Sequence, residues 1–403
     1  TVWGYGRFGD SLPRNGKPSS FHWPAFTIET RSNQTVQVTW VNQLVYGPGE
    51  GQPGYLPHLL PVDTTLHWAN PPGPPDTRTL TAGPYLGPVP IVTHVHGAHV
   101  PSISDGLPEA WYLPHANKIP SGYFTQGTHY GTAQPAKPGS AVFEYPNDQR
   151  AATLWYHDHA LGITRLNVYA GLAGFWIIRD VVEDSLDLPG PPPRLGDRAG
   201  TRYYEIPLAI QDRSFNEDGS LFYPDTRAFF DGFEGPYMPD EDSDVSPIWN
   251  PEFFGNTICV NGRTWPYLEV EPRLYRFRIL NGCNSRFLIL EFDQPLDFHQ
   301  IGTDGGLLPL LPLVQDQLLM APAERADVIV DFSGYEPGDE IVLLNTGPDE
   351  PFGELPVAPA EQASPATTGR VMQFRVVPLT GEGVPGQIPA ELPPIKPLTE
   401  AGA

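Results

Sequence analysis

The feature that most constrains the fold of this chain is an internal repeat of strand-like sequence. Residues 24–31 read Pro-Ala-Phe-Thr-Ile-Glu-Thr-Arg, and residues 266–273 read Pro-Tyr-Leu-Glu-Val-Glu-Pro-Arg. The likeness resumes, in matching order, at Val36, Val38, Trp40 and Asn42 in the first copy and at Tyr275, Phe277, Ile279 and Asn281 in the second. Both copies alternate apolar and polar residues, which is typical of a half-buried β-strand. The repeat therefore predicts two copies of one β-domain in tandem.

Proline and glycine are frequent, with 49 Pro and 41 Gly among 403 residues. Proline lacks the backbone N–H that helix interiors and central strands use, so this composition favours many short strands joined by turns. A hydrophobic content of 40% is enough for ordinary cores and argues against a disordered chain. We therefore expect an all-β protein.

Shifts in composition divide the chain into four parts. The first domain is expected over residues 1–180, because the segment 174–180 reads as a closing strand. A Pro-rich linker is predicted over residues 181–202 and the second domain over residues 203–378. Residues 379–403 are rich in Pro, Gly and Glu and are expected to form a linker or loose terminus.

The charge balance bears on the partners of this chain. A net charge of −23, from 24 basic and 47 acidic residues, argues against a polyanion such as nucleic acid. No apolar stretch approaches the ~18–20 residues that cross a bilayer, so no membrane partner is expected. The chain opens at Thr1 with no Met and no signal peptide, so we expect that an N-terminal piece is missing. The cellular location stays open.

The two cysteines, Cys259 and Cys283, form either one disulfide or two buried thiols, and the sequence does not decide between them. Neither has a histidine neighbour. Their surroundings matter because a cysteine thiolate combined with two histidines is a copper-binding arrangement.

Two His-x-His pairs carry the strongest chemical signal, His94 with His96 and His157 with His159. Residues i and i+2 of a strand point to the same face, about 6–7 Å apart, so each pair directs two imidazoles into one space. Imidazole suits copper, zinc, iron and nickel. The pairs therefore predict a metal site. Ordinary core or surface histidines are the alternative, and zinc or a single copper ion is an alternative occupant.

The pairs lie in longer patterns: Thr-His-Val-His-Gly at 93–97, Ser-Asp-Gly-Leu-Pro-Glu-Ala-Trp at 104–111, and Leu-Trp-Tyr-His-Asp-His-Ala at 154–160. Further patterned segments follow at residues 164–171, 210–219, 260–262, 300–306 and 322–325. Together these segments resemble multicopper oxidases, in the branch that holds bacterial spore-coat laccases, phenoxazinone synthase and bilirubin oxidase. The resemblance spans nearly the whole chain.

The resemblance implies cupredoxin-like domains, each a Greek-key β-sandwich, of which a full-length member has three. The fold class expected here is all-β, with two such sandwiches in tandem. In the family a trinuclear copper cluster takes eight histidines from four His-x-His motifs, two in the first domain and two in the third. By resemblance, type 2 copper is bound by His94, and the type 3 pair by His96, His157 and His159.

Asp105 matches a carboxylate that lies near the cluster in the family, and the resemblance implies a catalytic role in handling protons as oxygen becomes water. A turn residue before Gly106 is the simpler interpretation.

The sequence departs from the family at the electron-entry site. Type 1 copper is bound there by a His-Cys-His stretch of the third domain, and this chain has neither that stretch nor any histidine after His299. We therefore expect half of the ligands of the type 2 and type 3 sites, no type 1 site, and a tail that leads to an absent third domain.

Three explanations follow from this departure. A third cupredoxin domain comes from the same precursor or from another chain; or the protein is a non-catalytic binding or scaffold module; or the cluster is completed between subunits. The first predicts a laccase-like oxidase that couples one-electron oxidation of phenolic or related small molecules to four-electron reduction of O₂ to water. It is expected to be active only when the third domain is supplied, and the sequence identifies neither its substrate nor its oligomeric state.

Overall fold

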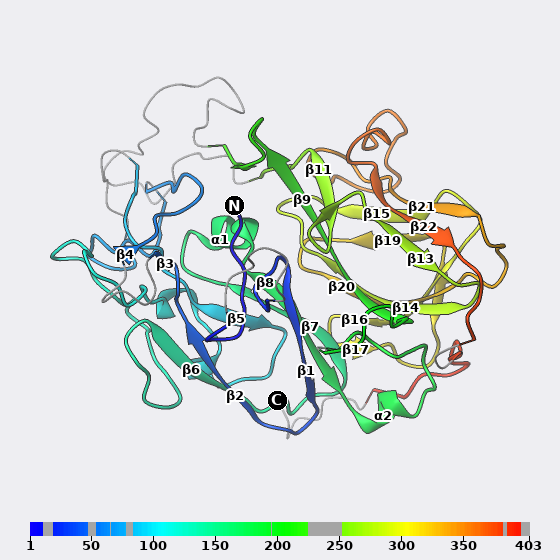
Figure 1. Ribbon diagram of the computed structural model, residues 1–403, viewed down its shortest axis with the longest axis horizontal. Coiled ribbons are helices and arrows are strands. Elements are labelled where there is room, and N and C mark those ends of the chain that lie inside the picture. The colour runs from blue at the N-terminus through cyan, green and yellow to red at the C-terminus, as the bar shows by residue number, and fades with distance from the viewer. Residues whose placement is uncertain are drawn as a thin grey trace. The chain divides into compact units, whose positions relative to one another are not determined.

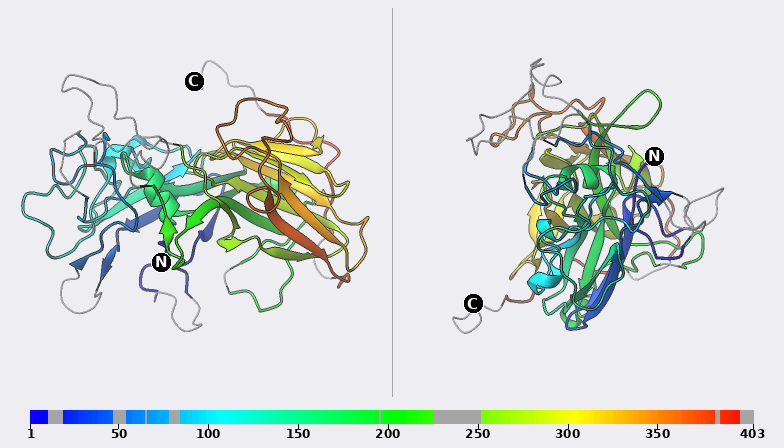
Figure 2. Two further views of the ribbon diagram at one scale, coloured as in Figure 1. Left: turned by 90° about the horizontal axis from the view of Figure 1, so that it is seen from above. Right: turned by 90° about the vertical axis from the view of Figure 1, so that its left-hand side faces the viewer.

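The computed structural model describes residues 1–10, 19–46, 54–64, 66–77, 84–194, 196–224, 252–381 and 385–395. Strands dominate these residues, and the two α-helices are only four and seven residues long (Figures 1 and 2). No helix within these ranges is long and apolar enough to cross a membrane. The prediction of an all-β protein is confirmed.

Three sheets contain the described strands of the first half of the chain. The largest has the order β1 (Ala25–Arg31), β8 (Ala173–Arg179), β7 (Ala152–Asp158) and β5 (Thr93–His96). The second pairs β2 (Val36–Val41) with β6 (Ser140–Tyr145), and the third pairs β3 (Val45–Tyr46) with β4 (Gly54–Tyr55). Short helices occupy the connections: Ser102–Ser104 and Pro108–Ala110, both 3₁₀, and α1 (Thr164–Ala170).

Two larger sheets follow. A nine-stranded sheet has the order β12 (Arg263–Thr264), β11 (Thr257–Val260), β9 (Glu205–Phe215), β14 (Leu274–Asn281), β20 (Arg325–Asp331), β16 (Phe298–Thr303), β17 (Gly306–Leu307), with β10 (Leu221–Phe222) on β9 and β18 (Leu313–Gln315) on β16. A five-stranded sheet has the order β13 (Tyr267–Val270), β22 (Arg370–Val376), β21 (Glu340–Asn345), β15 (Leu288–Phe292), β19 (Gln317–Met320).

Side chains from both larger sheets form one apolar core. Ile279 of β14 and Val330 of β20 come from the nine-stranded sheet, whereas Leu290 of β15 and Phe374 of β22 come from the five-stranded sheet, and all four are at most 1% exposed. The alternation of apolar and polar residues along each strand places these side chains on one face, so the two sheets pack as a sandwich.

The contacts of the chain separate two compact units. The first comprises residues 1–149, 155–176 and 214–251, and the second comprises 150–154, 177–213 and 252–403. The division passes through β7 and β8, so these units differ from the predicted ranges 1–180 and 203–378.

The predicted linker and tail contain ordered structure. The linker begins with α2 (Val181–Asp184). In the tail, the Leu392 N–H donates to the Leu310 carbonyl at 2.8 Å, and the Leu392 side chain is buried in a small apolar cluster with Ile301 and Ile329. Residues 396–403 of the tail lie outside the described residues.

The internal repeat corresponds to strands in opposing sheets. Its first segment forms β1 in one copy and β13 in the other, and its second segment forms β2 and β14. In the first copy the Asn42 amide donates to the carbonyls of Val89 and Tyr112 at 2.9 and 3.1 Å, and its oxygen accepts the Leu44 N–H at 3.2 Å.

The second copy repeats this arrangement. The Asn281 amide donates to the carbonyls of Arg286 and Met320 at 3.0 and 2.9 Å, and its oxygen accepts the Cys283 N–H at 3.1 Å. Asn42 and Asn281 are 3% and 0% exposed. Matching residues of the sequence repeat thus tie the end of the same strand to three backbone groups in each copy.

A buried ion-pair network lies within the second unit. It joins three arginines to three carboxylates, all at most 8% exposed: Arg179, Arg276, Arg278, Glu183, Glu205 and Asp327. The charges balance, which is what makes their burial tolerable. Because α2 contributes Glu183, the network anchors the start of the predicted linker.

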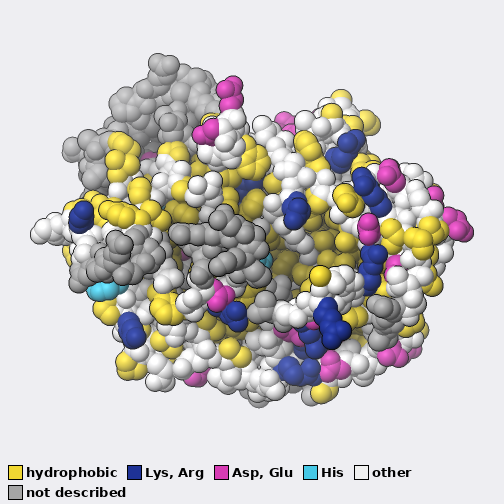
Figure 3. Space-filling view, viewed as in Figure 1, with side chains coloured by type: hydrophobic (Ala, Val, Ile, Leu, Met, Phe, Trp, Pro, Cys, Tyr) yellow, Lys and Arg dark blue, Asp and Glu magenta, His cyan; other side chains and the backbone are white. Residues whose placement is uncertain are grey.

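On the surface, Lys and Arg are interspersed with Asp and Glu on the face shown in Figure 3.

Both cysteines are buried free thiols, which decides the alternative that the sequence left open. Burial raises the pKa of the Cys259 thiol, and burial raises that of the Cys283 thiol well above its ordinary value.

Candidate metal centre

Two antiparallel strands of the first unit position the histidine pairs. In the pairing of β5 with β7, His94 lies opposite His157, and His96 lies opposite Trp155. Side chains alternate along a strand, so His94, His96 and His157 share one face. His159 follows directly after β7, where its N–H donates to the Val92 carbonyl at 2.8 Å.

The four imidazoles lie together. The rings of His94 and His159 stack with centroids 4.7 Å apart, and the His94 ring lies 5.5 Å from that of His157 and 5.7 Å from that of His96. The potential ligand atoms of His94, His96 and His157 all lie within 4.8 Å of one another. The structure therefore brings the four predicted ligands into one cluster.

Backbone carbonyls determine the tautomer of three of these rings. Nδ1 of His94 lies 2.6 Å from the Asp105 carbonyl, Nδ1 of His159 lies 3.0 Å from the Gly106 carbonyl, and Nδ1 of His157 lies 2.7 Å from the Asp158 carbonyl. A carbonyl can only accept, so each Nδ1 carries the proton and donates it. In a neutral ring this leaves Nε2 with a bare lone pair, which is the form that binds a metal.

Burial keeps two of these rings neutral. It lowers the pKa of His157 well below the ordinary value of 6.5, and it also lowers the pKa of His159. The neighbouring imidazoles act in the same direction, because like charges close together disfavour protonation. These two imidazoles are thus uncharged near neutral pH.

These residues fit a copper ion. Nε2 of His157 lies 3.4 Å from Nδ1 of His96, within hydrogen-bond distance. A metal ion bound to either nitrogen would replace this hydrogen bond. Histidine nitrogens grouped in this way form a donor set that copper and zinc both accept.

Asp105 contacts the cluster through its backbone and its side chain. Its carbonyl accepts the His94 proton, and its carboxylate Oδ1 lies 3.4 Å from the same nitrogen. It also ends the short helix Ser102–Ser104, since its N–H donates to the Ser102 carbonyl at 3.3 Å. The following Gly106 has φ +72°, and a Cβ there would meet the Thr93 carbonyl oxygen at 2.2 Å. The structure thus agrees with either interpretation of Asp105: the residue contacts a histidine of the cluster, and it also lies in the turn before Gly106.

Trp155 forms part of the wall of the site. Its ring centroid lies 4.1 Å from that of His157 and 5.6 Å from that of His96, which it stacks at an interplanar angle of 27°. It is 6% exposed. Trp155 lies two residues before His157 on the same strand, so its side chain points to the same face as the histidines.

A buried network of hydrogen bonds extends from the second histidine pair, and no local sequence pattern predicted it. Asp158 is fully buried, and its carboxylate accepts the N–H groups of Val92 and Ala160 at 3.0 Å and the Asn167 amide at 2.7 Å. Burial raises the pKa of Asp158 to about 7. The Asn167 oxygen in turn lies 3.0 Å from Nε2 of His58. This hydrogen-bond network holds the backbone between His157 and His159.

His99, by contrast, lies outside the cluster. Its side chain is 67% exposed, and its Nδ1 lies 3.5 Å from the carboxylate of Asp148. His99 is therefore a suitable control in mutagenesis, because it follows the first histidine pair but lies outside the cluster.

Known proteins share both the sequence pattern and the fold. A family model described as multicopper oxidase matches residues 114–182. A laccase of Bacillus stratosphericus is 42% identical over 378 residues, which are 93% of this chain and 60% of that protein. A laccase of Bacillus subtilis (strain 168) is 41% identical over 354 residues, which are 88% of this chain and 55% of that protein. The chain thus spans a little more than half the length of these relatives.

Solved structures agree with this picture. The McoA multicopper oxidase from the hyperthermophile Aquifex aeolicus is similar with a TM-score of 0.59 and 26% identity, covering 100% of this chain and 69% of that one. A bacterial laccase-like multicopper oxidase, CueO from Ochrobactrum sp., has the same fold, with a TM-score of 0.59, 21% identity, and coverage of 95% of this chain and 62% of that one. The prediction of tandem cupredoxin-like sandwiches is confirmed.

Proposed function

Because the chain belongs to the multicopper oxidase family, we propose that its histidine cluster is half of a trinuclear copper site in a laccase-like oxidase. In this proposal His94 binds type 2 copper, and the type 3 pair is bound by His96, His157 and His159. The observation that carries it is the convergence of the imidazoles, with ligand atoms of three of them within 4.8 Å of one another.

Copper held here would accept electrons one at a time and deliver four of them to O₂, so that water is the product. The chain's own residues have other tasks. The carbonyls of Asp105, Gly106 and Asp158 fix the tautomers of three ligands, and the buried Trp155 excludes water from one side of the rings. The Asp105 carboxylate, 3.4 Å from Nδ1 of His94, is proposed to hold and pass protons at the site.

The reductant is proposed to be a phenol or a related small molecule, oxidised one electron at a time. The sequence contains no His-Cys-His stretch for type 1 copper, and its paired histidines number four of the eight that the family uses. We therefore propose that a further cupredoxin domain, from the same precursor or another chain, supplies the remaining ligands. On its own, the 403-residue chain is expected to have no oxidase activity.

Copper titration of the full chain tests the site. We expect wild-type protein to bind copper, and His157→Ala to weaken binding by more than about a hundredfold, since even groups outside the ligand shell count for ten- to a hundredfold. The matched control is His99→Ala, which removes an exposed imidazole and is expected to bind as wild type does. Equal binding by the two variants would refute the proposed ligand set. Preference for zinc over copper would support a zinc site instead.

Activity tests the oxidase. Phenol-dependent O₂ consumption is expected only after a domain bearing His-Cys-His is added to the copper-loaded chain. A chain that binds no copper and gains no activity would instead be a binding or scaffold module of the family.

A further inference from the structure

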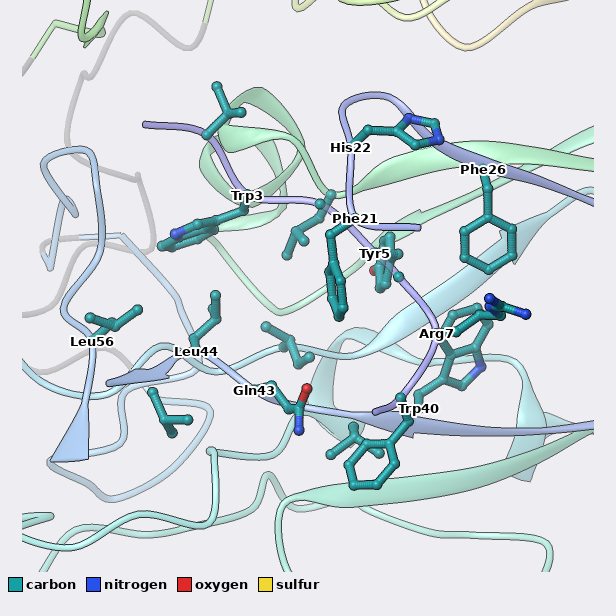
Figure 4. A pocket seen from close by; sticks show the side chains of 18 of the residues that line it. Trp3, Tyr5, Arg7, Phe21, His22, Phe26, Trp40, Gln43, Leu44 and Leu56 are labelled. Carbon is teal, nitrogen blue, oxygen red and sulfur yellow. The ribbon is translucent and has the colours of Figure 1, made fainter. Parts of the chain in front are cut away.

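The first unit contains a cavity of about 1010 Å³ between its two main sheets. β1 forms one wall and belongs to the sheet with β8, whereas β2 forms the opposite wall and pairs with β6. The first residues of the chain and the segments around Leu44 and Leu56 complete the lining (Figure 4).

The strands leave inward-facing apolar side chains unpacked. Phe26 and Ile28 alternate along β1, and Val38 precedes the buried Trp40 by two positions along β2. Phe26, Ile28 and Val38 face the cavity and are only partly buried, although the alternation assigns them to the interior of the sandwich. Protein interiors contain few voids larger than a water molecule. This space is partly open to solvent, and apolar side chains from two sheets line it, which is the usual form of a small-molecule site.

The wall formed by the first residues is closely fitted. The Trp3 N–H donates to the Ala170 carbonyl at 2.7 Å, and the Tyr5 hydroxyl accepts from the Thr93 hydroxyl at 3.2 Å. A Cβ at Gly6 would lie 2.4 Å from the ring of Phe21. The cavity is therefore largely preformed, as small-molecule sites usually are.

The lining is aromatic and lacks carboxylates. Trp3, Tyr5, Phe21, Phe26 and Trp40 surround the space in Figure 4. No Asp or Glu lines it among the described residues, although the chain has 47 acidic residues.

The lining also contains a few cationic and polar groups, most of which already have partners within the protein. The guanidinium of Arg7 pairs with Asp10 at 3.2 Å, so its charge is compensated. Both ring nitrogens of His58 bond to protein groups, the backbone of Leu60 and the oxygen of Asn167. The amide of Gln43 is the polar group best suited to orient a guest (Figure 4).

We propose that this cavity binds an uncharged aromatic small molecule, stacked between the side chains of the two sheets. Aromatic walls gain most from flat apolar guests. A cationic guest would lose its hydration with no carboxylate in the described lining to replace it, and an anionic guest would meet there only the imidazole of His22 and a guanidinium already paired with Asp10. The volume suits a guest of drug-like size, which pockets of roughly 300–1,000 Å³ hold. The site is separate from the histidine cluster, and the proposal does not depend on the oxidase function.

Two fluorescent probes on the full chain test the proposal: N-phenylnaphthylamine, which is uncharged, and its sulfonated analogue, anilinonaphthalene sulfonate. Measurements at about 0.5 M salt screen the net charge of −23, so that it does not decide the comparison. We expect one equivalent of the uncharged probe to bind, and to bind more tightly than the sulfonate.

A pair of neighbouring substitutions locates the site. Val38→Trp extends a larger side chain into the cavity from β2 and is expected to weaken binding of the uncharged probe by roughly tenfold or more, because the added ring occupies space that the probe needs. Gln37→Trp places the same side chain on the exposed face of the strand and should leave binding unchanged. If Val38→Trp does not fold, Ile28→Phe intrudes on the cavity from β1 with a smaller change.

Three results would overturn the proposal: no binding of the uncharged probe by wild-type protein, equal or tighter binding of the sulfonate, or equal binding by folded cavity-filling variants and Gln37→Trp.

Discussion

Replacing Asn42 by alanine tests whether the repeated asparagine stabilises each sandwich. The substitution removes three hydrogen bonds and leaves the carbonyls of Val89 and Tyr112 and the N–H of Leu44 without that partner. A net value of about 1 kcal/mol for each bond gives a loss of about 3 kcal/mol in the free energy of unfolding. Asn281→Ala removes three equivalent bonds and is expected to cost about the same in the second unit.

Asn42→Asp separates hydrogen bonding from packing. The carboxylate keeps the acceptor for Leu44 but loses both donors, and it places negative charge against two carbonyl oxygens at a buried position. We therefore expect Asn42→Asp to be less stable than Asn42→Ala, although aspartate is closer to asparagine in shape.

Urea unfolding followed by tryptophan fluorescence provides the measurement, with midpoints and slopes fitted for each transition. Gln37→Ala on the exposed face of β2 is the control and should change stability by less than about 0.5 kcal/mol. A cost below about 1 kcal/mol for Asn42→Ala, or an Asp variant as stable as the Ala variant, would refute the reasoning.

Three further predictions follow from buried groups. Burial alone would raise the pKa of Glu183, but the arginines of the buried ion-pair network lower it from 4.5 to about 2. Its stabilising contribution is therefore complete above pH 4.5 and disappears as the pH falls toward 2; acid titration of Glu183→Gln should show about 3 kcal/mol less loss of stability over this range than wild type. Asn167→Ala removes the amide bonded to Asp158 and should weaken copper binding by about ten- to a hundredfold with an unchanged circular dichroism spectrum; unchanged affinity would contradict its positioning role. Cys259 and Cys283 should resist a thiol reagent in the native protein and both react after unfolding without reductant, whereas a disulfide would leave neither reactive.

The sequence predicted much of the site because the relevant signal is local. In a strand, two residues separated by one position face the same side, so the spacing of His94 and His96 indicated convergence without knowledge of the fold. Nothing comparable marked His58, which has no paired spacing and meets Asn167 from 109 positions away. Hydrogen bonds between such distant residues depend on the packing of loops, which no local pattern encodes.

The sequence by itself determined that this chain forms short strands and that its two halves repeat one domain, and it predicted that the imidazoles of two His-x-His pairs come together. Periodicity and residue spacing carry that information within a few positions of each residue. Only the tertiary structure decided that β5 pairs with β7 with His94 opposite His157, and that the carbonyl of Asp105 selects the tautomer of His94. It also decided that β1 and β2 face each other across an open cavity. Register and packing arise from many weak contacts between segments far apart in the chain, so they are properties of the folded molecule.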